Sequence, residues 1–198
     1  MNENSIPFNE EVLINAYCHG YFPMGEEDTD EIEWYRPDPR AIFPLGEFHI
    51  SRSLVRKINK RDYEIRINTR FEDIIRHCRK QHSEGVWITE KMMAMYSSLH
   101  AKGFAHSLEV YKNNQLAGGL YGVAIGGAFF GESMFHLQTD CSKIALCELV
   151  FRMKQKGMIL LDTQFSTPHL ERFGVKNVPD SEYYKLLRKA ISLPVSFL

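Results

Sequence analysis

Two acidic residues and a glutamine stand out because they lie in apolar parts of the sequence. Glu132 interrupts the largely apolar run Ala128–Phe135, and Asp162 and Gln164 follow the continuous apolar run Met158–Leu161. Residues i and i+2 of a strand point the same way, so Asp162 and Gln164 are expected to share a face. Carboxylates beside a neutral amide could position an amine and take up its proton. From these residues alone, a polar strand end that bonds a neighbouring loop is an equally good interpretation.

The surrounding elements predict how these side chains are brought together. In the stretch Gly118–Gln164, two apolar runs meet at Gly126-Gly127, a dipeptide that suits a two-residue hairpin because it allows positive φ. Asp140 can cap a helix, and Gly157 stands where a helix C′ residue belongs. The apolar positions of this helix recur at helical spacing: Ala145, Leu146, Leu149, Val150 and Met153. Strand, helix and strand in this order predict a crossover between parallel strands, and open α/β sheets bind ligands at the carboxyl ends of such strands.

The remaining elements follow from capping residues and hydrophobic periodicity. In the first part of the chain we expect a helix from Asn9 to about Ala16, a stiff turn at Trp34–Arg40 between two short extended pieces, and a helix from Ser51 or Ser53 to about Lys60. A strand with Tyr63, Ile65 and Ile67 on one side should follow, then a helix from the capping box Thr69–Glu72 to about Lys80 and a helix from Thr89 to Gly103. We further expect a hairpin of His106–Tyr111 and Gln115–Ile125, and helical segments at Pro168–Phe173 and Ser181–Ala190.

This order of elements resembles that of the acetyltransferase (GNAT) superfamily. We therefore expect an α+β protein with a small N-terminal domain over residues 1–60 and a GNAT-like domain over residues 61–198, in which helices flank a mixed β-sheet.

Composition is that of a soluble globular protein. The chain has 198 residues, of which 44% are hydrophobic and 25% charged. The acidic, polar N-terminus argues against a secretory signal peptide, and the uncharged run Leu116–Gly131 is too short and too rich in glycine to span a bilayer. No two of Cys18, Cys78, Cys141 and Cys147 form a CxxC pair, so we expect free thiols in a reducing cytoplasm.

The net charge of −1 conceals a strong asymmetry along the chain. Residues 1–47 hold eleven acidic and two basic residues, giving −9, whereas residues 52–80 hold ten basic and four acidic residues, giving +6. The predicted basic helix carries Arg52, Arg56 and Lys60 on one face, flanked by Lys57 and Arg61. A solvated helix face is the usual interpretation of such a run. We favour a phosphate-binding face, because no acidic residue lies between the first and last of these bases.

Several motifs resemble those of one bacterial family, the leucyl/phenylalanyl-tRNA–protein transferases. GESMF at 131–135 and LDTQ at 161–164 flank a helix with the pattern SK-A-L. Further matches follow in the same order along nearly the whole chain: GYFP at Gly20–Pro23, WYRPDPR at Trp34–Arg40, FHISRSL at Phe48–Leu54, VWIT at Val86–Thr89 and AHSLEV at Ala105–Val110. The resemblance implies a GNAT-like domain behind a small N-terminal one. It also implies an enzyme that transfers Leu, Phe or Met from aminoacyl-tRNA to proteins with N-terminal Lys or Arg, which marks them for degradation in the N-degron pathway.

The resemblance also implies roles for individual residues. Asp162 and Gln164 match the family's catalytic Asp-x-Gln, and Glu132 matches the acidic residue that selects Lys or Arg. A neutral amide has almost no proton affinity, so we expect Gln164 to position the amine, and Asp162, or water held by it, to accept the proton. Positions that line the donor side-chain pocket in the family are Leu120, Phe129, Leu149 and Met153, although an ordinary core would use the same residues.

Two more positions concern the tRNA. Trp87 is the best candidate to stack on the terminal adenine, and the basic helix suits phosphates far from the reaction centre. Met24 stands where the family often has an aromatic residue. Methionine can still pack against a purine, so stacking there is expected to be weaker or to depend on Trp87.

Two other functions stay open at this point. A CoA-dependent N-acetyltransferase would use a glycine-rich turn to hold the pyrophosphate, but the segment Phe135–Lys143 contains no glycine and would place Asp140 near that group. A tRNA-binding module without catalysis is the second alternative. Neither a cofactor nor a metal is expected: His106, His136 and His169 are isolated, and an aminoacyl ester is already activated toward an amine whose free pKa is about 7.7–8.0.

Overall fold

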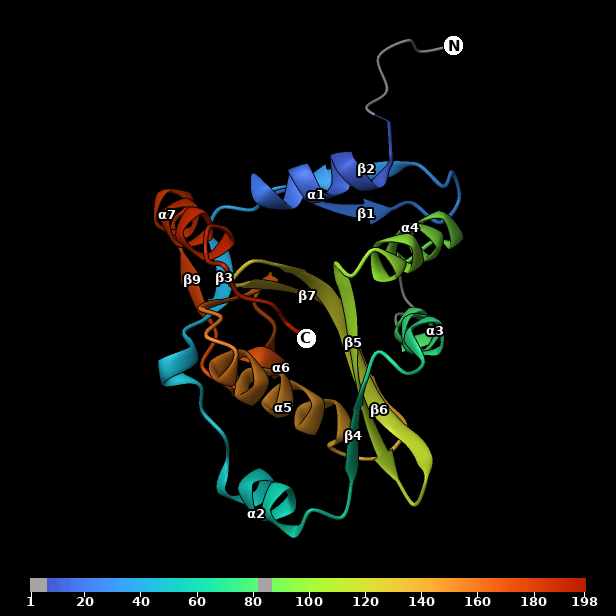
Figure 1. Ribbon diagram of the computed structural model, residues 1–198, viewed down its shortest axis with the longest axis vertical. Helices are drawn as coiled ribbons and strands as arrows, with labels where there is room; N and C mark the ends of the chain where they lie inside the picture. The colour runs from blue at the N-terminus through green and yellow to red at the C-terminus, as the bar shows by residue number, and fades with distance from the viewer. Residues whose placement is uncertain (1–6, 82–86) are drawn as a thin grey trace.

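The computed structural model describes residues 7–81 and 87–198, and it consists of a seven-stranded mixed sheet covered by helices on both faces (Figure 1). The strand order is β4-β5-β6-β7-β8-β3-β9, and a separate two-stranded sheet pairs β1 with β2. The expected α+β class with a mixed sheet flanked by helices is confirmed.

The elements have the following bounds. The strands are β1 (Phe22–Gly25), β2 (Ile32–Tyr35), β3 (Arg40–Phe43), β4 (Glu64–Ile67), β5 (Ala105–Lys112), β6 (Gln115–Ile125), β7 (Ala128–His136), β8 (Leu160–Gln164) and β9 (Lys176–Val178). The helices are α1 (Glu10–Cys18), α2 (Arg52–Lys60), α3 (Phe71–Gln81), α4 (Glu90–Ala101), α5 (Cys141–Gln155), α6 (Pro168–Glu171) and α7 (Asp180–Ile191), with a 3₁₀ turn at Leu45–Glu47.

The helices divide between the two faces of the sheet. Buried side chains of α1, α3, α4 and α7 form one hydrophobic cluster, and those of α5, α6 and α2 form a second cluster on the opposite face. Figure 1 shows α5 along one face and α3 and α4 along the other. The N-terminal elements α1, β1 and β2 lie across one end of the molecule, at the top of Figure 1. Phe22 and Met24 of β1 line the cavity described below.

The central crossover forms as the sequence predicts. Strands β5, β6 and β7 make an antiparallel meander, and β7 pairs in parallel with β8 through Ala128↔Leu160 and Phe129↔Leu161. Gly126 has φ +53, and a Cβ there would lie 2.6 Å from the carbonyl oxygen of Ile191 in α7. The turn therefore needs glycine both for its backbone conformation and for close packing.

Among the short strands, β1 and β9 were not expected, whereas β2 and β3 correspond to the two extended pieces expected on either side of the turn at Trp34–Arg40. Strands β1 and β2 form a hairpin, and β3 lies between β8 and β9, antiparallel to both. Such short strands owe their existence to long-range pairing rather than to local periodicity. Residues 40–43 of the segment expected to form a small N-terminal domain are thus part of the large sheet, and the boundary at residue 60 stays a prediction.

Two predicted helix caps differ in chemistry from the expectation. Asp140 precedes α5, but it has φ +68 and its carboxylate makes no cap; it pairs instead with Lys57 and Lys143. Thr69 is not half of a capping box, because its N–H and hydroxyl donate to Glu109 of β5. In both cases the residue bonds to a charged side chain distant in sequence, and the local hydrogen bond of a helix cap does not form.

Candidate active site

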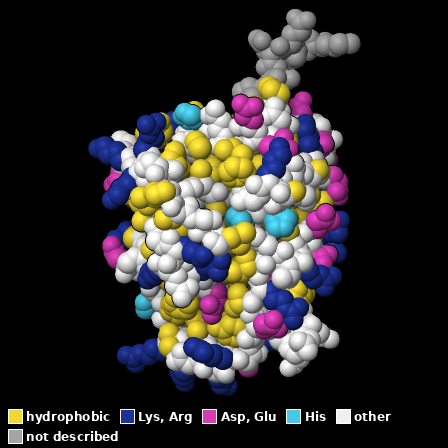
Figure 2. Space-filling model, in the orientation of Figure 1, with side chains coloured by type: hydrophobic (Ala, Val, Ile, Leu, Met, Phe, Trp, Pro, Cys, Tyr) yellow, Lys and Arg dark blue, Asp and Glu magenta, His cyan; other side chains and the backbone are white. Residues whose placement is uncertain are grey.

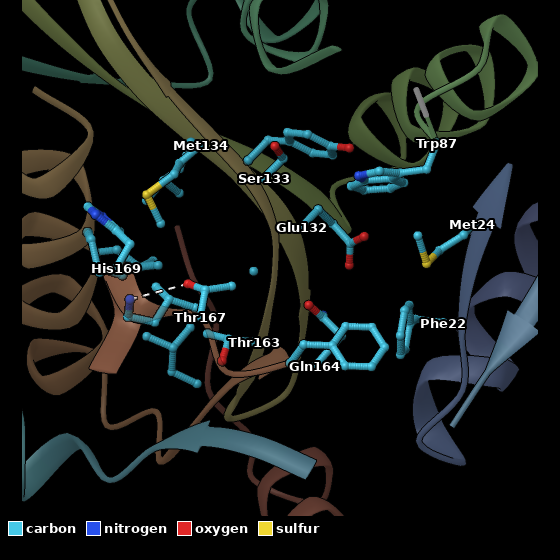
Figure 3. Close-up of a pocket in the computed structure, with 18 residues that line it drawn as sticks. Phe22, Met24, Trp87, Glu132, Ser133, Met134, Thr163, Gln164, Thr167 and His169 are labelled. Carbon is cyan, nitrogen blue, oxygen red and sulfur yellow. Dashed lines mark hydrogen bonds between the residues drawn. The ribbon is translucent and has the colours of Figure 1, made fainter. Parts of the chain in front are cut away.

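A cavity of about 320 Å³ lies where β7 and β8 separate, and its walls come from both ends of the chain. Its lining residues are Phe22, Met24, Trp87, Leu120, Tyr121, Gly131, Glu132, Ser133, Met134, Leu146, Leu149, Leu161, Thr163, Gln164, Phe165, Thr167, His169 and Leu170. Figure 3 shows Glu132 and Gln164 near its middle, with Met134 and His169 toward one end and Phe22, Met24 and Trp87 toward the other. A polar centre therefore lies between an apolar end and an aromatic end.

The cavity opens because two strands lose their regular pairing. The parallel ladder of β7 and β8 ends at Phe130↔Asp162. On the other edge of β7, Gly131 faces Gly122 and Ser133 faces Tyr121, so Glu132 is the extra residue of a β-bulge. A bulge leaves its residue outside the ladder and changes the direction of its side chain, which here points into the cavity (Figure 3).

Two buried tyrosines hold the Glu132 carboxylate. Tyr17 of α1 donates to one oxygen at 2.7 Å, and Tyr96 of α4 donates to the other at 2.9 Å. Burial raises the pKa of Glu132 to about 7, although both hydrogen bonds act in the opposite direction. The carboxyl group can therefore change its protonation state near neutral pH, which an exposed glutamate does not do.

Asp162 is enclosed by protein and does not line the cavity. Its carboxylate accepts two bonds at 2.9 Å from the guanidinium of Arg40, one at 2.6 Å from the hydroxyl of Tyr183 and one at 2.9 Å from the N–H of Gln164. The side chains of Asp162 and Arg40 both have 0% exposure. Direct contact of this carboxylate with a substrate amine would require the ion pair to break, so its visible role is to hold Gln164.

Gln164 does not share a face with Asp162, contrary to the i, i+2 expectation. Thr163 is an extra residue between the pairs Ala41↔Gln164 and Ile42↔Asp162, and Gln164 has φ +58. The amide fits its surroundings with its nitrogen donating to the carbonyl oxygens of Gly131 at 2.9 Å and Thr163 at 3.0 Å. The bulge thus turns Gln164 into the cavity and leaves its amide oxygen to accept.

The expected donor-pocket residues divide into two groups. Leu120 and Leu149 line the cavity, together with Met134, Leu146, Leu161 and Leu170, which the sequence analysis did not assign to the donor pocket. Phe129 and Met153 are fully buried in the core on the α5 side of the sheet and are not among the cavity's lining residues. The ring of Phe129 packs against Phe197 near the C-terminus, with centroids 5.1 Å apart.

Trp87 and Met24 are brought to the same end of the cavity. The N–H of Gly25 donates to the carbonyl oxygen of Trp87 at 2.9 Å, which fixes β1 against the segment before α4. A Cβ on Gly25 would lie 2.5 Å from the side chain of Thr89, so only glycine permits this approach. Phe22 and Phe165, in edge-to-face contact at 5.7 Å, complete the aromatic end. Val86 of the VWIT motif lies outside the described residues.

The basic helix α2 lies at the edge of the molecule (Figure 1), and none of its residues is among those that line the cavity. Ser51 caps it, and Leu54 is its buried residue. Lys57 pairs with Asp140, a contact between distant residues that the sequence analysis did not foresee. In the parts of the chain that the structure describes, Arg52, Arg56, Lys60 and Arg61 form no ion pair, and Figure 2 shows Lys and Arg side chains along the lower edge, where α2 lies.

Four positioning residues escaped the sequence analysis: Arg40, Tyr183, Tyr17 and Tyr96. Arg40 ends the WYRPDPR motif, and this was the one hint available. The tyrosines lie in three helices far apart in the sequence, and nothing local distinguishes them from core residues. Over residues 7–81 and 87–198, no group of three His, Cys, Asp or Glu side chains could hold a metal ion, and no helix there is long and apolar enough to cross a membrane.

The fold and the cavity together define a class of enzyme. The site combines a bulged strand that presents a carboxylate, a parallel partner strand that separates from it, and an apolar compartment. These features suit transfer of an acyl group to an amine. The segment before α5 carries Asp140 paired with two lysines and no glycine, which is unsuited to a CoA pyrophosphate.

Comparison with known sequences specifies the class further. The chain belongs to the leucyl/phenylalanyl-tRNA–protein transferase family: the profile of that family matches residues 42–188, and the profile of its N-terminal domain matches residues 8–38. A relative of that name from Akkermansia muciniphila is 48% identical over 96% of this chain and 98% of its own length. Relatives from Gloeobacter violaceus and Salinibacter ruber are each 44% identical, over 97% and 92% of this chain and 98% and 80% of their own. The chain is therefore an aminoacyl-transferring enzyme.

Solved structures show more distant likenesses. L-PGS from Bacillus licheniformis aligns with a TM-score of 0.44 at 13% identity, over 89% of this chain and 62% of that one. The PaiA N-acetyltransferase from Thermoplasma acidophilum, in complex with coenzyme A, aligns with a TM-score of 0.34 at 14% identity, over 48% of this chain and 75% of that one.

Proposed function

We propose that this enzyme transfers Leu, Phe or Met from aminoacyl-tRNA to the α-amino group of proteins that begin with Lys or Arg, and so creates a degradation signal. The supporting observation is one cavity in which an apolar compartment meets a carboxylate and an amide. The free thiols among the described residues suit a reducing compartment, and we place the reaction in the cytoplasm.

The apolar end of the cavity receives the donor side chain. Leucine, methionine and phenylalanine are uncharged and of similar length, so leucine-lined walls accept each of them at small cost. The aliphatic residues of the cavity all belong to the hydrophobic cluster on the α5 side of the sheet: Leu120, Met134, Leu146, Leu149, Leu161 and Leu170. His169 lies beside Met134 (Figure 3). A charged donor side chain would find no ion-pair partner there, because burial lowers the pKa of His169 at this end and so favours its neutral form.

The aromatic end receives the terminal adenosine of the tRNA. Trp87 and Phe22 line this end with aromatic side chains, and Met24 adds a polarisable side chain next to them. Basic helix α2 then contacts tRNA phosphates at a distance from the reaction. Such contacts add affinity without base specificity, as a transferase that accepts several tRNAs requires.

The polar centre of the cavity receives the acceptor. The amide oxygen of Gln164 accepts a hydrogen bond from the α-amine and positions it toward the ester carbonyl. Glu132 attracts the cationic side chain of an N-terminal Lys or Arg. Because the ester is activated, the amine attacks directly once it has lost its proton, and no covalent enzyme intermediate is needed. The enclosure of Asp162 argues against our first expectation that this carboxylate takes the proton.

The test is transfer of radiolabelled leucine from leucyl-tRNA to a peptide that begins with Arg. Label in the peptide supports this function. Acetyl transfer from acetyl-CoA to the same peptide would instead support an N-acetyltransferase, and binding of leucyl-tRNA without transfer would support a tRNA-binding module.

Replacement of Glu132 by Gln tests the acceptor assignment with almost no change in side-chain size. Removing one charge of a partly buried ion pair costs about 2–5 kcal/mol, so transfer to an Arg-peptide should fall well over tenfold. Transfer to an Ala-peptide should fall far less, and binding of leucyl-tRNA should not change. Equal losses with both peptides would show that Glu132 serves the chemistry or the fold rather than selection.

A further inference from the structure

The contacts around Glu132 form a closed ring of three oxygen groups. Tyr17 Oη lies 2.7 Å from one carboxyl oxygen, and Tyr96 Oη lies 2.9 Å from the other. The two phenolic oxygens are themselves 2.8 Å apart. All three distances lie in the range of O–H···O hydrogen bonds, so the ring contains three such contacts.

Counting protons shows which state of Glu132 satisfies the ring. Each phenol carries one proton, and burial raises the pKa of Tyr17 and Tyr96 well above its ordinary value, so both stay protonated. If Glu132 is ionised, two protons must serve three contacts, and the two phenolic oxygens then face each other with lone pairs. If Glu132 carries a proton, each group donates once and accepts once around the ring. The three contacts of the ring are therefore best satisfied with Glu132 neutral.

The surroundings of the ring favour the same state. Tyr17 and Tyr96 have no exposed surface, and Glu132 itself is only partly exposed, on the side of the cavity. The charged groups that act on it are Arg40 of β3 and Asp162 of β8, which form an ion pair with each other and so largely offset one another. Tyr121 of β6 also packs here and contributes an uncharged hydroxyl. Burial of the carboxyl group thus remains the dominant influence.

We propose that Tyr17 and Tyr96 are specificity-determining residues of the acceptor site: with Glu132 they form a ring of hydrogen bonds that holds a proton until a cationic acceptor side chain displaces it. This proposal rests on the assignment of Glu132 to acceptor selection. When the cation binds, the O–H bond of the carboxyl group breaks, the proton leaves to solvent, and the carboxylate pairs with the guanidinium or ammonium group. A neutral acceptor side chain releases no proton.

The consequence is that preference for a cationic acceptor depends on pH. Below about pH 6 the ring holds its proton and opposes the cation, whereas above about pH 8 the carboxylate is free to pair. The ratio of kcat/KM for an Arg-peptide to that for an Ala-peptide should therefore rise across this interval. Deprotonation of the α-amine affects both peptides alike, so the ratio cancels it.

Four variants identify the source of the pH dependence. Glu132→Gln should make the ratio independent of pH. Tyr17→Phe removes two of the three contacts of the protonated ring but only one of the two bonds to the carboxylate, so the midpoint should move downward by about one pH unit. Tyr96→Phe should act in the same direction. An upward shift would show two independent bonds to the carboxylate and would overturn the ring. Tyr121→Phe is the matched control, because its buried hydroxyl has no hydrogen-bond partner among the described residues and its loss should leave the midpoint unchanged.

A direct measurement covers the case in which a tyrosine variant fails to fold. In the unmodified protein with ¹³C-labelled glutamate and no substrate, one carboxyl resonance should titrate near pH 7 and should be missing from the Glu132→Gln spectrum. A ratio that stays constant between about pH 6 and pH 8, or a Glu132 resonance that titrates below about pH 5, overturns the proposal. Absence of any Arg preference at every pH would instead overturn the assignment of Glu132 to acceptor selection.

Discussion

Replacing Arg40 by Met should strongly destabilise the protein, because it leaves the Asp162 carboxylate charged and buried. The guanidinium of Arg40 makes two bonds to Asp162, donates to the carbonyl oxygen of Gly20 at 3.0 Å and stacks over Phe22 and Tyr183. Breaking a buried pair by removing one partner costs about 3–5 kcal/mol. At about 2–4 °C per kcal/mol for a chain of this size, Tm should fall by about 6–20 °C.

The matched control is Arg36→Met. Arg36 also makes two bonds to an aspartate, Asp180, but these side chains are 28% and 36% exposed, and such pairs are worth about 0–1 kcal/mol. Urea unfolding of both variants compares the two sites. If Arg40→Met cost no more than Arg36→Met, the argument from burial would be refuted.

The double variant Arg40→Met/Asp162→Asn separates charge from position at the same site. The asparagine oxygen, in the place of Oδ1, can still accept from the N–H of Gln164, and its NH2 group, in the place of Oδ2, can donate to the hydroxyl oxygen of Tyr183, without a buried charge. We expect the double variant to be more stable than Arg40→Met alone. Loss of a general base usually slows a reaction by about 100-fold or more. If Asp162 only positions Gln164, the rate of transfer by the double variant should fall by less than this. A greater loss would identify Asp162 as the proton acceptor.

Three further predictions concern charge and stacking. Between its ordinary pKa of 4.5 and the raised value of about 7, Glu132 holds a proton in the folded protein that it has lost in the unfolded chain. Relative to Glu132→Gln, the parent should therefore be most stable at low pH, and its free energy of unfolding should fall by about 2 kcal/mol between pH 5 and pH 8. Urea titrations of both proteins measure this, and a difference that stays constant with pH would contradict it. Arg52→Ala with Arg56→Ala should weaken binding of every accepted aminoacyl-tRNA alike and reduce the slope of log K against log salt by about 2; an unchanged slope would place the tRNA elsewhere. Trp87→Ala should weaken binding of leucyl-tRNA by about 1–3 kcal/mol, measured by filter binding, and affinity equal to the parent's would show that the adenine stacks on another side chain.

The elements around the crossover could be predicted because their sequence patterns are local. Alternating or continuous apolar runs have few ways to bury themselves, so β5, β6, β7 and β8 form where periodicity places them. Gly157 has φ +72 and ends α5 as a C′ residue should. Neither strand β9 nor the place of β3 in the large sheet could be found in this way, since a strand of three or four residues is stabilised by its neighbours and has no period of its own.

The candidate residues were a harder problem, because sequence spacing assumes regular strands. The i, i+2 rule placed Asp162 and Gln164 on one face, but the bulge at Thr163 separates them, and Asp162 turns away to pair with Arg40. Glu132 was recognised as unusual in an apolar run, but not as the extra residue of a second bulge. Bulges depend on how two strands fit together, so neither strand alone reveals them.

The sequence by itself determined the class of fold, the family to which the chain belongs and the position of the basic helix, and it singled out Glu132 and Gln164, two of the polar residues that line the cavity. These follow from local chemistry, from periodicity and from ordered motifs. Only the tertiary structure decided what surrounds them: that Tyr17 and Tyr96, from two separate helices, close a ring on Glu132, and that Arg40 neutralises Asp162. The physical reason is that protonation and proton transfer depend on burial and on partners a few ångströms away, and these come from residues far apart in the chain.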